Sequence, residues 1–347
     1  TDIMFRPTFT YSNSDGINKS TSGSYNANPY SYVLDPLSKE SITKLSEENL
    51  MVNTRDNSSL SNSNNKNIGA SLQYNRKFGS KGRNLTLKGD VNYGKSDSKN
   101  LSLSNVHLYQ LMNSSNADST YQTNRWNVTP TTNSGYDLQF TYSEPIMRAT
   151  FLQFSYKFQY KYSKSDRSTY DFSNLGENFF SGLPLTYGGW NSYLSKLANP
   201  VESYIDNDLS RYSEYKNYIH DFELMLRIIR TKYTFNVGVM VEPQKSSYMQ
   251  DYKGVHVDTT RTVTNVTPTL DFRYRFSKVS NLRINYRGTT SQPSMTQLLD
   301  ITDDSDPLNI SKGNPGLKPS FTNNFRLFYN NYIEKKQRAI MTFINYS

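Results

Sequence analysis

Residues 68–78 read IGASLQYNRKF, and apolar side chains occupy nearly every second position of this run. Ile68, Ala70, Leu72 and Tyr74 alternate with small or polar residues. Successive side chains of a β-strand point to opposite faces, so a period of two indicates a strand whose faces differ. The run therefore predicts a strand with one apolar and one polar face.

Seven further runs repeat this alternation, at residues 85–93, 136–142, 152–162, 222–228, 233–241, 270–276 and 282–286. Across all eight runs the apolar positions contain one charged side chain, Arg76, which lies beside an expected turn. The opposite positions carry most of the charge, from Lys77 near the first turn to Arg287 directly after the last run. Charge is therefore confined almost entirely to one face of each expected strand.

This separation of charge favours strands that cross a lipid bilayer. A charge on a lipid-facing strand costs roughly 2–4 kcal/mol in mid-bilayer and close to nothing at the interface. About 9–11 residues of tilted strand suffice to cross. The 28 Tyr and 18 Phe of the chain are the residues that interfacial girdles use. We therefore predict an all-β fold, a transmembrane antiparallel up-and-down β-barrel.

Membrane-spanning helices are not expected. The mean hydropathy is −0.74. A helical span needs roughly 18 consecutive apolar residues, and the nearest candidate, residues 224–229, is short and interrupted by Arg227. A barrel remains compatible with this composition, because only every second residue of a strand has to be apolar.

The connections between the runs alternate between short and long. The short ones are residues 79–83, 144–148, 229–232 and 277–281, and the long ones are residues 94–133, 163–216, 243–261 and 288–320. Outer-membrane barrels have short periplasmic turns and long extracellular loops. We therefore expect the short set to face the periplasm and the long set to face the outside of the cell.

One long connection contains a cluster of aromatic residues in a Gly-rich segment. Its members are Phe179, Phe180, Tyr187, Trp190 and Tyr193. Aromatic side chains on a loop can form a contact surface for a ligand, and they can equally pack the loop on itself. The sequence leaves both interpretations open.

Catalysis and nucleic-acid binding have little support. The chain contains no GxSxG, HExxH or Walker sequence, and His220 and Asp221 are neighbours on an expected strand, so they point to opposite faces. Cys is absent. The formal net charge is +9, but much of the basic charge alternates along the strands rather than gathering on one exposed surface. We expect no enzyme, no bound metal or cofactor, and no nucleic-acid partner.

The C-terminal region contains motifs of a known family. The most specific is Gly313, Asn314, Pro315, Gly316, Leu317, Lys318 and Pro319. Residues 281–286, 292–294, 297–298 and 306–310 add to it, as do residues 142–145 and 32–37. Together they resemble the C-terminal half of TonB-dependent outer-membrane transporters, in particular their outer-membrane β-barrel family. The family usually has Glu after the last of these Pro residues, where this chain has Ser320.

The resemblance implies a barrel of about 22 strands around an N-terminal plug, opened by the energy-transducing TonB complex. Here we count about eleven strands, with residues 3–11, 325–329 and 339–346 included. Residues 1–347 are thus expected to be a partial transmembrane β-barrel domain, with the plug and the remaining strands outside this sequence. Unpaired strand edges in a bilayer leave backbone groups unsatisfied, at several kcal/mol each.

The function implied by the resemblance is TonB-dependent uptake of a large or scarce ligand, such as an iron chelate, a glycan or a peptide. The expected location is the outer membrane of a Gram-negative bacterium. The expected partners are outer-membrane lipid, the chain's own plug and the TonB complex, with a surface lipoprotein as a further option. The alternative is a surface assembly or adhesion barrel that holds partner proteins with its extracellular loops.

A basic wall is expected inside the barrel. If the hairpin at residues 277–281 keeps Phe276 and Leu282 together on the lipid face, Arg275 lies opposite Arg283, and Asp271 lies opposite Arg287. Arg273 then lies between them on the same wall. Directly opposed like charges destabilise a strand pair, so acidic groups of the plug or an anionic ligand are expected there. The alternative is that water alone hydrates these arginines.

Overall fold

The computed structural model describes residues 1–112, 118–176, 179–291, 293–298, 302–303, 311–314, 316–333 and 337–347. In this part of the chain, eleven strands form one antiparallel sheet, in the order β1-β2-β3-β4-β5-β6-β7-β8-β9-β12-β13. The strands are β1 Asp2–Tyr25, β2 Met51–Phe78, β3 Arg83–Met112, β4 Asp118–Met147, β5 Thr150–Asp171, β6 Ile205–Ile229, β7 Tyr233–Tyr252, β8 Val255–Arg275, β9 Ser280–Ser291, β12 Ser320–Ile333 and β13 Arg338–Tyr346. The all-β prediction and its strand number are confirmed.

The remaining elements lie in the connections between these strands. They are η1 Pro29–Ser31, α1 Lys39–Glu47, η2 Ser173–Leu175, α2 Trp190–Leu194, η3 Val201–Tyr204 and α3 Met295–Leu298, with a small ribbon of β10 Thr302–Asp303 and β11 Ser311–Lys312. Among the described residues, no helix has both the length and the apolar character that crossing a membrane requires.

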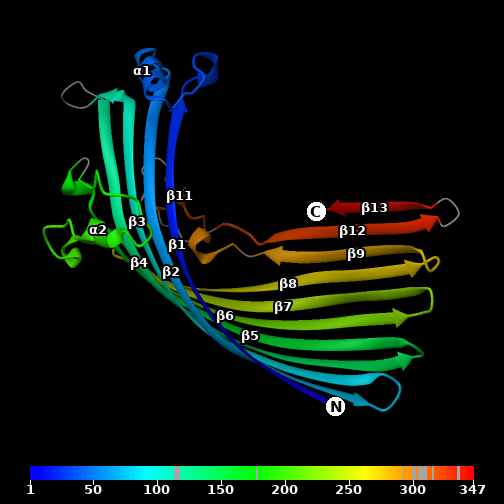
Figure 1. The fold of residues 1–347 in the computed structure, drawn as a ribbon. Coiled ribbons are helices and arrows are strands. Elements are labelled where there is room, and N and C mark those ends of the chain that lie inside the picture. The colour runs from blue at the N-terminus through cyan, green and yellow to red at the C-terminus, as the bar shows by residue number, and fades with distance from the viewer. Residues whose placement is uncertain are drawn as a thin grey trace.

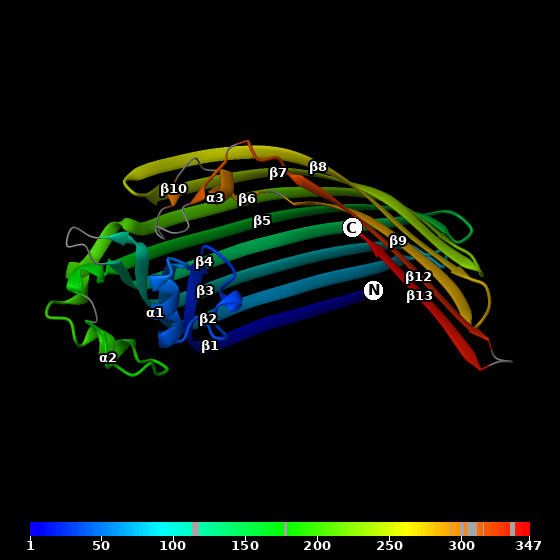
Figure 2. The same ribbon diagram turned by 90° about the horizontal axis from the view of Figure 1, so that it is seen from above.

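The sheet is one continuous curved wall (Figures 1 and 2), with β1 and β13 at its two edges. Each strand pairs with the next strand of the sheet in antiparallel fashion, which is the up-and-down arrangement. The four connections expected to be short all lie at one end of the wall, on the right in Figure 1, and the chain's helices lie at or near the other end. The predicted alternation of short and long connections is present in part, because β7 and β8 are joined at the other end by only two residues.

Strand pairing joins the apolar positions of successive strands into continuous rows. Such a row crosses the wall through Leu87, Phe140, Tyr156, Phe222, Val241 and Val266, each directly paired with the next. Most of these side chains are exposed, including Phe222 at 42% and Val266 at 53%. We call the side that carries these rows the apolar face, and the opposite side the polar face.

Two of the expected long loops are mainly strand. Residues 94–133 extend β3 and β4, and residues 243–261 extend β7 and β8, which are joined by a turn at Lys253 and Gly254. The apolar alternation stops in these extensions, but backbone pairing continues, for example from Gly94 paired with Asn133 to Leu101 paired with Trp126. The expected loop bounds were wrong there because strands outside a lipid belt need no apolar face.

Candidate functional site

The aromatic loop, which is the connection between β5 and β6, packs against the parts of β2, β3 and β4 that extend beyond the apolar alternation. Phe172, Phe180 and Tyr193 are 0%, 6% and 3% exposed, and they form one cluster with Leu60, Leu101 and Trp126 of β2, β3 and β4. Phe172 and Phe180 have ring centroids 5.8 Å apart, and Phe180 and Tyr193 have centroids 5.7 Å apart. Figure 1 shows this loop, with α2, beside the far ends of β3 and β4. The loop is held as a small hydrophobic core.

Four of the five aromatic residues of the expected contact surface belong to this packing. Phe179 meets Phe180 edge-on at 4.9 Å, and Trp190 lies 5.7 Å from Trp126. Tyr187 differs, with 69% of its surface exposed. The arrangement is the one that the self-packing interpretation expects, and ligand contact stays a prediction for all five residues.

Burial also keeps the hydroxyl of Tyr193 protonated. Its hydroxyl donates to the Leu183 carbonyl oxygen at 3.2 Å. Burial raises the pKa of Tyr193, because a charged phenolate is poorly solvated there. The hydroxyl therefore keeps the proton that this hydrogen bond needs.

The register of the basic wall differs from the expected one by two residues. Arg273 lies opposite Arg283, and Arg275 lies opposite Asn281. Arg287 lies opposite Thr269 rather than Asp271. The connection is residues 276–279, closed by the Phe276 amide donating to the Ser280 carbonyl at 2.9 Å, and it is shorter than expected. A shift of two residues keeps every side chain on its expected face.

The opposed arginines of this wall share one carboxylate from the same chain. Arg273 Nε donates to Asp271 Oδ1 at 3.0 Å, and Arg283 Nη2 donates to Asp271 Oδ2 at 2.8 Å. The Asp271 side chain is only 16% exposed, whereas both guanidinium groups are about half exposed. Asp271 thus supplies one acidic partner to both opposed arginines, and contact of the wall with a plug or an anionic ligand stays a prediction.

Replacing this shared carboxylate should make the like charges repel. We expect Asp271→Asn to destabilise the folded protein by about 1–2 kcal/mol, since hydrogen bonds to charged groups contribute roughly 1.5–3 kcal/mol and these arginines are partly solvated. Denaturant titration of the full-length protein in lipid measures this. Adding Arg283→Gln to Asp271→Asn should recover most of the loss. A double variant that is no more stable than Asp271→Asn alone would contradict the shared-carboxylate interpretation.

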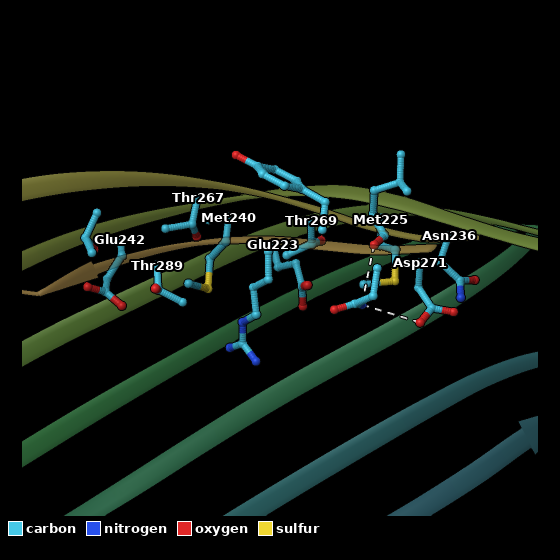
Figure 3. A pocket seen from close by; sticks show the side chains of 15 residues that line it. Glu223, Met225, Asn236, Met240, Glu242, Thr267, Thr269, Asp271 and Thr289 are labelled. Carbon is cyan, nitrogen blue, oxygen red and sulfur yellow. Dashed lines mark hydrogen bonds between the residues drawn. The ribbon is translucent and has the colours of Figure 1, made fainter. Parts of the chain in front are cut away.

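A pocket of about 470 Å³ lies on the polar face of β6 to β9, beside this ion pair. Fifteen residues line it, among them Glu223, Glu242, Asp271 and Arg287 (Figure 3). The alternating pattern places these charges on the polar face, but their meeting depends on the register of four strands. For that reason the sequence did not single out Glu223 and Glu242.

Residues 191–347 match the Outer membrane protein beta-barrel family. The chain is part of an outer-membrane β-barrel. Its location is therefore the outer membrane of a Gram-negative bacterium, and in such barrels the apolar face contacts lipid. A comparison with curated proteins found no match.

Several solved structures are remotely similar to this barrel segment. The ferric yersiniabactin uptake receptor FyuA from Yersinia pestis is 10% identical, with a TM-score of 0.40 over 82% of this chain and 44% of its own. The alcaligin outer membrane receptor FauA from Bordetella pertussis is 9% identical, with a TM-score of 0.36 over 98% and 50%. The siderophore receptor PiuA from Acinetobacter baumannii is 8% identical, with a TM-score of 0.39 over 84% and 52%. The chain thus spans about half the length of these receptors.

The family motif forms a turn that ties a long connection of the barrel to its wall. Asn314 Oδ1 accepts from the Gly316 amide at 2.9 Å, and the Asn314 amide donates to the carbonyl of Gln297 in α3 at 2.6 Å. Arg261 of β8 reaches the Leu317 carbonyl at 3.4 Å. Gly313, Lys318 and Pro319 flank this turn, whereas Pro315 and residues 306–310 lie outside the described residues.

The described residues of the barrel contain no cluster of three or more His, Asp or Glu side chains placed to hold a metal ion. His220 and Asp221 point to opposite faces, as expected. The His220 ring contacts the Tyr156 hydroxyl at 2.9 Å on the apolar face, and Asp221 Oδ2 accepts from Gln159 Nε2 at 2.7 Å on the polar face. These two side chains therefore do not act as a pair.

Proposed function

We propose that residues 1–347 form part of the barrel of a TonB-dependent receptor, which imports a ligand too large or too scarce for diffusion. The observation that carries this proposal is the polar face of the wall, where the pocket of β6 to β9 and the ion pairs of Asp271 lie. In an outer-membrane barrel the polar face lines the lumen. A lumen lined by charges and a pocket suits the passage of a polar ligand. The proposed ligand is an iron chelate, a glycan or a peptide.

The number of strands supports import through a plugged barrel. The wall has eleven strands, and β1 and β13 are its edges rather than partners of each other in the described part. Unpaired edges in lipid cost several kcal/mol for each exposed backbone group, so further strands have to close the barrel. Barrels much wider than about 8 strands enclose a channel or a plugged lumen. A plug and the TonB complex are accordingly the proposed partners.

A second candidate is a barrel that holds partner proteins at the cell surface. The observation favouring it is the structured region beyond the lipid belt, where the aromatic loop and the wall enclose a groove of about 360 Å³. Lys19, Asp56 and Gln122 from the wall and Phe179 from the loop line it. A surface lipoprotein is one partner that such a region could hold.

Growth experiments distinguish the two candidates. A strain that lacks the gene is complemented with the full-length gene, with and without functional TonB, and grown on iron chelates, glycans or peptides as sole sources. Import predicts that complementation restores growth on at least one source and that loss of TonB abolishes it. Equal growth of all strains on every source, together with a change in cell adhesion, would favour the second candidate.

A further inference from the structure

Three carboxylates gather on the polar face between β6 and β7. Ile219 pairs with Gln244 and Phe222 pairs with Val241, so Asp221 faces Glu242 across the two strands. Glu223 is two residues along β6 on the same face, opposite Met240. Like charges that face each other directly destabilise a strand pair. Positive charge nearby would therefore stabilise this part of the sheet.

The cations around this cluster supply only part of that charge. Arg287 is the one cationic side chain among the described residues that line the pocket. Lys157, which lies opposite Asp221, forms its ion pair with Asp137 at 3.1 Å. Asp271, the fourth carboxylate nearby, is already shared by Arg273 and Arg283. Lys161 also lies close enough to Glu242 to interact with it electrostatically, so Arg287 and Lys161 face three carboxylates, and the cluster keeps more negative than positive charge.

Neutral donors cover two of the carboxylate oxygens and leave other acceptors open. Asn265 Nδ2 donates to Glu242 Oε1 at 2.9 Å, and Gln159 Nε2 donates to Asp221 Oδ2 at 2.7 Å. Asn236 Oδ1 is buried and has no hydrogen-bond partner among the described residues. Asn236 lines the pocket (Figure 3). Buried acceptors without a donor are costly, so they point to a donor-rich group.

A buried threonine gives an independent indication of the same kind. Thr267 lines the pocket from β8, opposite Met240, and is 5% exposed. Its Oγ1 has no hydrogen-bond partner within the described part of the chain. Nearly all buried side-chain polar atoms in proteins are paired. An unpaired hydroxyl in the same lining as two carboxylates indicates that the pocket is shaped to bind a polar group.

We infer that this pocket binds a guanidinium or primary ammonium group. Such a group combines positive charge with three to five N–H donors and no acceptor, which matches the Glu223 and Glu242 carboxylates and the open acceptors around them. The inference rests on the proposed function in that the polar face lines a lumen. The group belongs either to an Arg or Lys side chain of the plug or to a cationic imported ligand.

The test uses the purified full-length protein in lipid nanodiscs. The double variant Glu223→Gln/Glu242→Gln removes two charges and keeps both volumes. Its matched control is Glu214→Gln, which removes a carboxylate from the same strand but on the apolar side, where Glu214 accepts from Tyr212. The probe is agmatine, which has one guanidinium and one ammonium group, and its affinity is measured by titration calorimetry. Hydrogen exchange of the plug is measured in parallel.

The two possible sources of the cationic group, the plug and the imported ligand, predict different results. If the imported ligand supplies the cation, agmatine binds the unsubstituted protein, its affinity falls at least tenfold in the double variant, and plug exchange is unchanged. If the plug supplies it, plug amides exchange at least tenfold faster in the double variant and at the normal rate in the control. In a full chain without a plug, agmatine binding alone decides.

Unchanged plug exchange together with absent or unaltered agmatine binding would overturn the inference and leave a hydrated wall. If the double variant does not assemble, the single variant Glu223→Gln is judged by the same criteria. Neither readout requires TonB or uptake. A failure here therefore leaves the growth experiment independent, and a failure of TonB-dependent growth leaves cation binding to be judged by its own measurement.

Discussion

Arginine introduced at Leu138, Phe154, Leu224 or Val237 is expected to destabilise the assembled barrel by about 2–4 kcal/mol at each position. All four side chains lie on the apolar face, and Leu138 and Leu224 are 56% and 48% exposed there. In lipid the guanidinium group would lose its hydration without gaining a partner. Denaturant titration of full-length variants folded into lipid vesicles measures the loss.

Matched controls are available one residue away on the polar face. Gln139 follows Leu138 on β4, and Asn236 precedes Val237 on β7. Asn236 lies opposite Asp271, so an arginine there meets a carboxylate on the lumen side. Gln139→Arg and Asn236→Arg are expected to change stability far less than their neighbours do. Equal losses on the two faces would show that the assignment of lipid and lumen sides is wrong.

The faces of the strands could be predicted from sequence because the side-chain period is local. Each residue of the run from Ile68 to Tyr74 takes its side from its immediate neighbours, whatever strand lies beside it. Register is different, because it depends on the conformation of the turn. Closure at Phe276 and Ser280 moved Arg273, rather than Arg275, opposite Arg283. The face of each residue was therefore predicted correctly, but the contacts within the basic wall could not be predicted.

For related reasons, the sequence pattern predicted neither the extended strands nor the carboxylate cluster. Residues 57–65 of β2 are mainly Ser and Asn, which carry no apolar alternation, yet they pair continuously with β1 and β3. Glu223, Glu242 and Thr267 come together from three strands. Only the register of those strands brings the two carboxylates and the unpaired hydroxyl into one pocket.

The packing of the aromatic loop could not be predicted from the sequence for the same reason. Leu60, Leu101 and Trp126 share a row across β2, β3 and β4, and that row can be read once the register is known. The residues that cover it come from the connection between β5 and β6, far along the chain. Sequence identified Phe180 and Tyr193 as a group but gave no sign of the surface beneath them.

Removing the centre of this cluster should release the loop while leaving the barrel assembled. Phe172 is fully buried and contacts Phe180 and Tyr204 at ring-centroid distances of 5.8 and 5.4 Å. Phe172→Ala is expected to lower the free energy of local loop opening by about 3–5 kcal/mol, through lost apolar contact and the cavity left behind. Hydrogen exchange of residues 179–204 in the full-length protein measures this opening.

The loop contains its own control in Tyr187, which is 69% exposed. Tyr187→Ala is expected to change the free energy of opening by no more than about 0.5 kcal/mol, as surface substitutions do. The barrel strands should exchange at unchanged rates in both variants, because Phe172 packs on the extended ends of the strands, beyond the rows that face lipid. Faster exchange in the lipid-facing strands would mean that the loop core also stabilises the barrel. Equal effects of Phe172→Ala and Tyr187→Ala would contradict the packed core and restore the loop as a contact surface.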